Sequence, residues 1–339
     1  MARSLEPRMR FLVTGSAGFI GFHLSHRLLA AGHEVEGIDN FSAYYDVALK
    51  NGRNAILESH PYFRVHRLDL EDAEGLSAVC TRFEPEVIVH LAAQAGVRYS
   101  IDHPEAYVSS NLIGTFNVLE AARRFQPKHL MAASTSSAYG ANIEMPFRET
   151  DRAVHPLTLY AATKSATELM GHSYSHLFRV PTTFFRFFTV YGPWGRPDMA
   201  LFKFARAILA DEPIEVYGHG RMSRDFTYVD DLIEAITRLV EVIPDREPVP
   251  GDTLSPVAPF RLVNIGGGTP SNLMDYVGEL EKALGREAKK TYLPMQDGDV
   301  PATFASADLL EVLIGYKPGT PISVGVPAFV AWYREHNGA

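Results

Sequence analysis

The sequence predicts an α/β protein built on a doubly wound parallel sheet, with a smaller lobe in the C-terminal half. Short apolar runs alternate with helical segments up to about residue 190, as in a parallel sheet covered by helices. A glycine-rich turn directly follows the first apolar run. Beyond residue 190 the chain becomes irregular and rich in proline and glycine. We therefore expect residues 1–190 to form the sheet domain, to which residues 229–268 return, and residues 191–228 and 269–339 to form the lobe.

Composition and charge restrict the class of protein. The 339 residues are 46% hydrophobic and 21% charged, which suits a large core and not a disordered chain. The net charge of -8 argues against a nucleic-acid surface. No apolar run has membrane-spanning length, and the first ten residues lack a hydrophobic signal core, so we expect a soluble cytoplasmic protein with a short flexible N-terminus. Cys80 is the single cysteine and the histidines show no ligand spacing, so no metal site is expected.

The glycine-rich turn has the features of a dinucleotide site. A strand over residues 10–14 runs into Gly15-Ser16-Ala17-Gly18-Phe19-Ile20-Gly21 and then a helix to about residue 31. Glycines permit a tight turn and close approach of a diphosphate, and the helix N-terminus offers free N–H groups. The next strand, residues 34–38, ends at Asp39, eighteen residues after the last glycine. A carboxylate there accepts both hydroxyls of an adenine ribose and repels a 2′-phosphate, which predicts NAD and not NADP.

Hydroxyl residues follow a central strand. Runs at 63–68 and 87–91 are apolar enough for a sheet covered on both faces, and a helix is expected over 104–125. The fifth strand, 129–133, leads into Ser134-Thr135-Ser136-Ser137. The carboxyl end of a central strand is where ligands bind in open α/β sheets. Capping of a turn is the alternative role for such a cluster.

Tyr160 and Lys164 are candidates for catalysis. Four residues apart on a helix over about 157–178, they lie on one face, and an ammonium near a phenol lowers the pKa of that phenol from about 10. Tyr160 is therefore a candidate proton acceptor. Most such pairs are ordinary solvated neighbours, and the nucleotide site upstream is what favours catalysis here.

The remaining chain predicts further elements of both parts. The rigid segment 191–197 carries two prolines, and residues 244–259 carry five, which indicates a surface loop able to move. Strands are expected at 182–188, 214–217, 224–228 and 261–265, and helices at 199–210, 229–242, 272–284, 306–314 and 322–335.

In order and type, these motifs resemble the extended short-chain dehydrogenase/reductases, and in detail the bacterial UDP-glucuronate 4-epimerases. The general resemblance rests on the glycine turn, Asp39-Asn40, Asp69-Leu70, His90-Leu91-Ala92-Ala93, Asn111 and the Tyr160/Lys164 pair. The closer one rests on residues 90–100, 186–199 (RFFTVYGPWGRPDM) and 224–231 (RDFTYVDD). It implies a Rossmann-type sheet, NAD as cofactor, and reversible inversion of C4 in a UDP-sugar used in polysaccharide biosynthesis.

The resemblance also implies roles for individual residues. Thr135 would orient the sugar O4, Tyr160 would take its proton, and Lys164 would hold the nicotinamide ribose. Arg224 would bind the diphosphate, Tyr217 the uracil and Asp299 the uridine ribose, with packing or capping as alternatives for the last two. The cofactor set is Gly15, Gly18, Phe19, Ile20, Gly21, Asp39, Asn40, Asp69, Leu70, Leu91, Ala92, Ala93, Gln94, Asn111, Tyr160 and Lys164. The substrate set is Arg98, Thr135, Ser136, Ser137, Thr189, Arg196, Tyr217, Arg224 and Asp299.

The substrate class follows from one position. Decarboxylating relatives carry an acid two residues after the catalytic threonine, and this chain has Ser137 there. Neutral hydroxyls at Thr135, Ser136, Ser137 and Thr189 could hold a C6 carboxylate, which favours UDP-glucuronate. Alternatives are a 4-epimerase for UDP-N-acetylhexosamine or a UDP-pentose, a UDP-glucuronate decarboxylase, and a non-catalytic NAD-sensing protein. The helices near 104–125 and 157–178 carry more apolar positions than one sheet-facing stripe needs, so a homodimer is expected.

Overall fold

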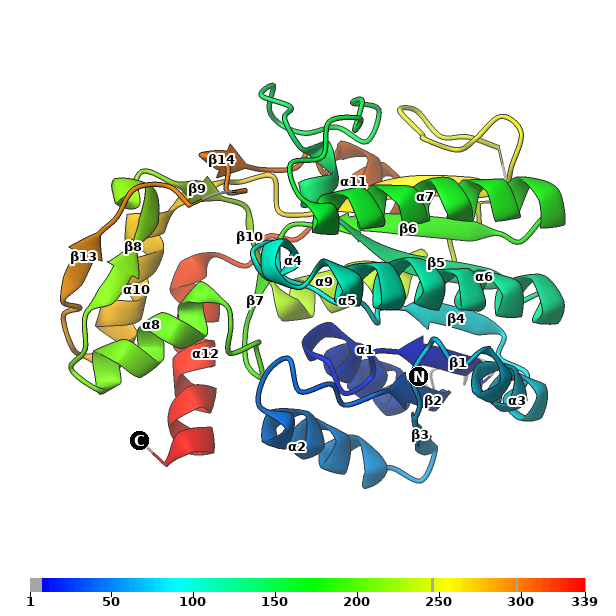
Figure 1. Cartoon of the computed structure of the whole chain (residues 1–339), viewed down its shortest axis with the longest axis horizontal. Helices are drawn as coiled ribbons and strands as arrows, with labels where there is room; N and C mark the ends of the chain where they lie inside the picture. Colours follow the sequence, from blue (N-terminus) through cyan, green and yellow to red (C-terminus); the bar gives the residue numbers. More distant parts are fainter. Residues whose placement is uncertain (1–7, 245–246, 297, 339) are drawn as a thin grey trace, which may run out of the picture.

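The central sheet has the predicted doubly wound form. The computed structural model describes residues 8–244, 247–296 and 298–338, so the expected flexible N-terminus lies outside them. Over this part of the chain seven parallel strands form one sheet (Figure 1). Their spatial order is β11 (Phe260–Ile265), β6 (Thr182–Phe187), β5 (His129–Thr135), β4 (Val87–His90), β1 (Arg10–Thr14), β2 (Glu34–Asp39) and β3 (Phe63–Arg67). The chain order reverses between β1 and β4, which opens a crevice at their carboxyl ends.

Helices cover both faces of this sheet. One layer contains α1 (Phe19–Ala30), α2 (Val47–Glu58), α9 (Val229–Leu239) and α11 (Asp308–Ile314); the other contains α3 (Ala73–Phe83), α6 (Gly114–Phe125) and α7 (Leu159–Phe178). Successive side chains of β1 alternate between the layers, because a strand has a period of two. Phe11 and Val13 join the core under α1 and α9, whereas Leu12 joins the core under α3 and α6. Burial on both sides explains why the central strands are almost continuously apolar.

The outermost strand β3 corrects the prediction that residues 63–68 are covered on both faces. β3 forms the sheet edge beside β2, and Arg64 and Arg67 are exposed. The ring of His66 bonds to Glu36 on β2 at 2.9 Å. Charged side chains at an edge discourage pairing with another chain. The flanking helices α2 and α3 were not identified from the sequence.

The helix expected over residues 104–125 is interrupted. It consists of α5 (Pro104–Tyr107), a π-helical segment η1 (Val108–Ile113) and α6, and α4 (Tyr99–Asp102) precedes it. Wider π turns place side chains differently from an α-helix and are frequent at functional sites. In this chain the π turn buries Asn111.

A smaller lobe lies beside the sheet, at the left of Figure 1. It contains α8 (Ala200–Leu209), α10 (Leu273–Leu284) and α12 (Ile322–Asn337), whose side chains share one apolar core that includes Phe204, Tyr276 and Phe329. Its short strands pair as β7 (Thr189–Tyr191) with β10 (Phe226–Tyr228), β8 (Ile214–Val216) with β13 (Lys290–Tyr292), and β9 (Ser223–Arg224) with β12 (Ser271–Asn272) and β14 (Ala302–Thr303). Although α11 belongs to residues 269–339, its Leu309 and Leu310 pack into the core beneath α9.

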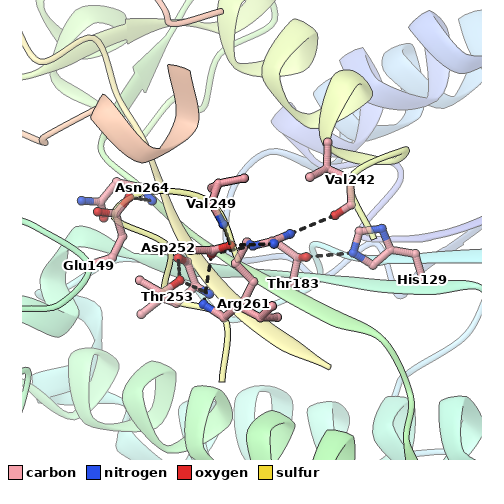
Figure 2. A network of polar contacts seen from close by, with 11 residues as sticks. His129, Glu149, Thr183, Val242, Val249, Asp252, Thr253, Arg261 and Asn264 are labelled. Carbon is pink, nitrogen blue, oxygen red and sulfur yellow. Dashed lines mark hydrogen bonds and ion pairs between the residues drawn. The ribbon is translucent and has the colours of Figure 1, made fainter. Parts of the chain in front are cut away.

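The proline-rich stretch 244–259 is tied to the sheet. Residues 245–246 lie outside the described part; residues 247–248, 250–251 and 256–257 are exposed as expected, whereas Pro244, Ala258 and Pro259 are buried. Figure 2 shows the tie: the Arg261 guanidinium on β11 donates to both carboxylate oxygens of Asp252, each at 2.8 Å. Both side chains are almost fully buried. Asp252 also accepts the backbone N–H groups of Val249 and Leu254. This network argues against the expected mobility of the loop.

No helix in the described ranges is long and apolar enough to cross a membrane.

The buried pair gives a stability prediction. Arg261→Met should lower the free energy of unfolding by about 3–5 kcal/mol, because it leaves the Asp252 carboxylate buried without its counter-charge. Lys282→Met is the matched control, since Lys282 pairs with Glu279 at the surface of α10; it should leave the free energy of unfolding nearly unchanged. Urea unfolding of both variants measures this. Equal losses in the two variants would contradict a structural role for the buried pair.

Candidate active site

A cavity opens at the point where the strand order reverses. It is lined by most of the residues predicted to bind cofactor and by two others of the predicted site, Thr135 and Arg196. The predicted residues on its wall are Gly15, Gly18, Phe19, Ile20, Gly21, Asp39, Asn40, Asp69, Leu70, Leu91, Ala92, Ala93, Gln94, Thr135, Tyr160, Lys164 and Arg196. Side chains that the sequence analysis did not identify also line it, among them Ser42, Tyr44, Tyr45, Lys50, Ser110, Ser134 and Met199.

The glycine-rich turn fits a dinucleotide because its backbone is packed too closely for side chains. A Cβ on Gly15, whose φ is +74°, would lie 2.8 Å from the Ala92 nitrogen, and a Cβ on Gly21 would lie 2.0 Å from the Gly15 oxygen. Helix α1 begins at Phe19 without a side-chain cap. Its first N–H groups are therefore available to an anion such as a diphosphate.

Asp39 closes the other end of the turn. One of its carboxylate oxygens accepts the Ala17 N–H at 3.1 Å and the other accepts the Phe41 N–H at 2.8 Å. Each oxygen keeps a lone pair that suits a ribose hydroxyl. Lys50 on α2 is also buried there, 3.7 Å from Asp39 and 3.2 Å from Ser42 Oγ. Lys50 was missed because α2 was not identified; its only signal is a lysine among apolar helix positions.

His90 supports the cavity floor. Its ring bonds to the hydroxyls of Thr14 at 2.8 Å and Thr115 at 3.0 Å. Burial lowers the pKa of His90 to about 3, so the ring is neutral. Thr14 Oγ1 also accepts the Ala92 N–H at 3.2 Å. This chain of bonds fixes the loop after β4 against β1.

Asn111 is the predicted cofactor residue that does not line the cavity. It is buried on the π turn, where its side chain accepts the Gln94 N–H at 2.8 Å and donates to the Gln94 oxygen and to Thr163 Oγ1. Asn111 thus joins the loop carrying Gln94 to α7. In the structure Asn111 therefore positions this wall of the cavity.

Thr135, Tyr160 and Lys164 meet at the inner end of the cavity. Burial raises the pKa of Tyr160, and a hydrogen bond with Thr135 only partly opposes this. In the protein alone the pKa of Tyr160 is therefore raised from its ordinary value, and not lowered as expected. Lys164 is 3% exposed, and burial lowers its pKa to about 8, against the opposing charge of Glu168. The ammonium still carries its proton at neutral pH.

A buried ion pair lies behind these groups. Glu168, one turn after Lys164, accepts two bonds from Arg186 on β6, at 2.9 and 2.7 Å, and a third from the hydroxyl of Ser134. Ser134 directly precedes Thr135, so Glu168 joins the catalytic helix to the end of β5. Sequence reasoning missed this pair, although charged residues on elements expected to be buried are a usable signal.

The other predicted substrate residues fall into two groups outside the main cavity lining. Arg98 bonds to Asp299 at 3.2 Å and lies over the ring of Tyr217 at 5.5 Å, and the charges of Arg98 and Asp299 both act on Arg224. These four residues, distant in sequence, are gathered at one place. Ser136, Ser137 and Thr189 form the second group.

The second group lies near the catalytic residues. Ser136 and Ser137 belong to a short 3-10 turn, in which the Ser137 N–H donates to Thr135 Oγ1 at 3.1 Å, as in the capping alternative. Thr189 lines a smaller apolar cavity that shares Arg196 with the main one. Arg196 bonds to Asp198, with Nε at 3.0 Å, and Tyr44 donates to the same carboxylate at 3.1 Å.

Comparison with known proteins gives concordant results. Residues 11–249 match the sequence profile of the NAD dependent epimerase/dehydratase family. A protein of Rhizobium meliloti described as a probable UDP-glucuronate 4-epimerase is 59% identical over 97% of this chain and 98% of its own. The crystal structure of the Bacillus cereus UDP-glucuronic acid 4-epimerase with UDP-glucuronic acid and NAD has a TM-score of 0.87 and 33% identity, covering 97% of this chain and 100% of that one. A UDP-glucose 4-epimerase of Thermotoga maritima with UDP-glucose has a TM-score of 0.84 and 27% identity, covering 97% and 100%.

The glycine turn gives a testable prediction for the cofactor. Gly21→Ala should lose most bound NAD, because the new methyl group would collide with the Gly15 carbonyl and displace the turn. Gly278→Ala on α10 is the control: its Cβ meets nothing within 4 Å, so NAD should be retained and stability should rise by about 0.5–1 kcal/mol. The NAD released from each denatured protein is measured by absorbance. Full NAD content in Gly21→Ala would show that the turn does not hold the diphosphate.

Proposed function

Because the chain belongs to the NAD dependent epimerase/dehydratase family, we propose that it interconverts UDP-glucuronate and UDP-galacturonate by epimerisation at C4. The observation that supports this proposal most directly is that one continuous cavity is lined by the glycine turn and Asp39 and also by Thr135, Tyr160 and Lys164. A dinucleotide held by the turn would extend toward the residues able to move a proton. The high identity to the Rhizobium relative supports the substrate.

Tyr160 is the group that takes the proton from the sugar O4. NAD, when bound, accepts the hydride from C4 and returns it to either face of the 4-ketosugar. Thr135 forms a hydrogen bond with the Tyr160 hydroxyl, and both hydroxyls can bond to the sugar O4. Because burial keeps the Tyr160 phenol protonated, positive charge must favour the phenolate during the reaction. The buried ammonium of Lys164, one turn away, supplies part of that charge.

A carboxylate at C6 would meet suitable partners. Arg196 lies on the wall shared by both cavities, Thr189 lines the smaller one, and Ser136 and Ser137 follow Thr135 in the 3-10 turn. With a hydroxyl at Ser137 in place of an acid, the group that decarboxylating relatives carry is absent from that position. Hydrogen bonds to a charged carboxylate are worth about 1.5–3 kcal/mol each, enough to restrain the C5–C6 bond.

Arg196 does not by itself distinguish an acidic sugar from a neutral one, because its guanidinium is already paired with Asp198. The neutral-sugar alternative has the weaker support from relatives, since the UDP-glucose 4-epimerase shares 27% identity. A non-catalytic NAD sensor would not need the buried set Thr135, Tyr160 and Lys164.

The nucleotide is proposed to bind the smaller lobe. Arg98, Tyr217, Arg224 and Asp299 supply two cations, an aromatic face and a carboxylate, which suit a diphosphate, a uracil and a ribose. In this division the sheet domain, residues 1–190 and 229–268, binds NAD. The lobe, residues 191–228 and 269–339, binds UDP, except that α11 packs against the sheet. Because the protein binds the substrate tightly through UDP, the 4-ketosugar can rotate and present its other face between the two hydride transfers.

Incubation of the purified protein with UDP-glucuronate tests the proposal. UDP-galacturonate should form, and UDP-pentose should be absent, when the nucleotide products are separated and weighed by mass spectrometry. UDP-glucose in a parallel reaction should be converted far more slowly. Loss of CO2 as the main reaction, or equal turnover of UDP-glucose, would reject UDP-glucuronate epimerisation.

Tyr160→Phe should lower turnover by about 10²-fold or more, which is the usual contribution of a positioned acid–base group. NAD content should be unchanged, because the diphosphate site lies on α1. A matched control is Tyr62→Phe, since Tyr62 is a partly exposed residue away from the cavity. Near-normal turnover in Tyr160→Phe would mean that another group takes the proton.

We also propose a cytoplasmic homodimer, since NAD and UDP-sugars are cytoplasmic metabolites. Apolar side chains remain exposed on the neighbouring helices α6 and α7, which lie side by side in Figure 1. They are Phe116 on α6 and Leu169 and Leu177 on α7, with Val108 and Ile113 on the adjoining π turn. Exposed apolar side chains on neighbouring helices suit a second copy of the same surface.

Leu169→Glu should convert the dimer into a monomer, because it places a charge on the proposed interface, where Leu169 is 74% exposed. Val312→Glu is the control: Val312 is 51% exposed on α11, in the opposite helix layer. Light scattering at micromolar concentration measures the mass. A monomeric native protein, or dimers of both variants, would reject this interface.

A further inference from the structure

Arg53 on α2 bonds to two parts of the molecule that are proposed to bind different ligands, the cofactor and the UDP-sugar. Its side chain has no exposed surface. One terminal nitrogen donates to the Ala17 carbonyl at 3.1 Å, inside the glycine turn. The other donates to the carbonyls of Trp194 at 2.5 Å and Gly195 at 3.2 Å. One planar group thus bridges the cofactor turn and the segment that carries Arg196.

The charge of Arg53 is not neutralised by an adjacent acid. Its bonds go to three carbonyls and to the hydroxyl of Tyr45 at 2.9 Å, and its Nε has no partner among the described residues. Burial lowers the pKa of Arg53, and the nearby positive charge of Arg196 lowers it further. The negative charge of Asp39 raises this pKa but does not cancel the effect of burial. A buried cation in such surroundings is stabilised when an anion binds close by. The glycine turn that it touches is the proposed site of the cofactor diphosphate.

Two further bonds connect the same two parts. Tyr44, in the loop after β2, donates to Asp198, and Asp198 bonds to Arg196. His23 on α1 donates from Nε2 to the Pro193 carbonyl at 2.9 Å. Segment 193–198 is therefore held from the cofactor side by three separate side chains. Trp194 also packs against Phe22 of α1 and Trp332 of the lobe, with ring centroids 5.5 and 5.3 Å apart.

We propose that Arg53 is a positioning residue that couples binding of the cofactor diphosphate to binding of the UDP-sugar through segment 193–198. An anion bound at the glycine turn fixes the conformation of the turn and of Arg53. Arg53 in turn fixes the backbone of segment 193–198, which positions Arg196 at the cavity. The inference rests on the proposed function, because it takes Arg196 as a substrate contact. By linkage, the cofactor and the UDP-sugar must then strengthen each other's binding by the same factor.

Calorimetry with UDP-glucuronate tests this coupling. The dissociation constant of UDP-glucuronate is measured for the NAD-loaded and NAD-free full-length protein. In the native protein we expect UDP-glucuronate to bind about 10-fold more tightly with NAD, within the usual range of coupling between sites. Arg53→Lys keeps the charge but not the planar fork that reaches both backbones, so the coupling should fall to less than about 2-fold.

The control is Arg67→Met. Arg67 on β3 bonds to Asn51 of the same helix α2 at 3.1 Å, and it is exposed and bonds to nothing in segment 193–198. Its coupling should match that of the native protein. Equal coupling in native protein and Arg53→Lys, or no coupling in native protein, would overturn the inference. Failure of native protein to bind UDP-glucuronate in either state would instead overturn the proposed function.

A measurement on native protein avoids dependence on the variant. Hydrogen exchange of the amides at residues 194–199 should slow when NAD is added to NAD-free protein, because Arg53 then holds their backbone more firmly. Exchange in helix α10, which has no contact with Arg53, serves as the internal reference. Unchanged exchange at residues 194–199 on addition of NAD would overturn the coupling, even if Arg53→Lys does not fold.

Discussion

The close packing of the glycine turn against the end of β4 is the constraint on which the active site depends. At Gly15 the two backbones approach so closely that a methyl group would meet Ala92 at 2.8 Å. This contact fixes β1 and β4 at the point where the strand order reverses. The neutral ring of His90 stabilises this contact, because it bonds to the hydroxyls of Thr14 and Thr115. The crevice above it leaves the N-terminus of α1 facing the carboxyl ends of the central strands.

Buried charges serve to position loops throughout this protein. Asp225 follows Arg224 and accepts the backbone N–H groups of Gly267, Gly268 and Ala305. It thereby holds together the strands that place Arg224. Asp39, Asp231 and Asp252 cap loops in the same way. A carboxylate that accepts several backbone bonds offsets much of its desolvation, and it constrains irregular backbone where no helix or sheet does so.

The catalytic helix combines two opposing electrostatic effects. Burial raises the pKa of Tyr160 and lowers that of Lys164, so the protein alone favours neutral groups at both positions. Glu168 opposes this effect at Lys164, and Arg186 keeps Glu168 paired. The protein therefore holds a protonated lysine one turn from a protonated tyrosine, and further positive charge near Tyr160 would favour its phenolate.

Local sequence determined the doubly wound sheet, the glycine turn, Asp39 and the pairing of Tyr160 with Lys164, because periodicity and spacing act over one or two turns of chain. Tertiary structure alone decided the rest. Arg98 and Asp299 bond across two hundred residues, and Arg53 meets Ala17 and Trp194 only after folding. The same holds for the raised pKa of Tyr160: spacing placed a cation nearby, but burial depends on the many side chains that exclude water around it. Long-range contacts leave no periodic signal in the sequence, since each is set by the packing of whole elements.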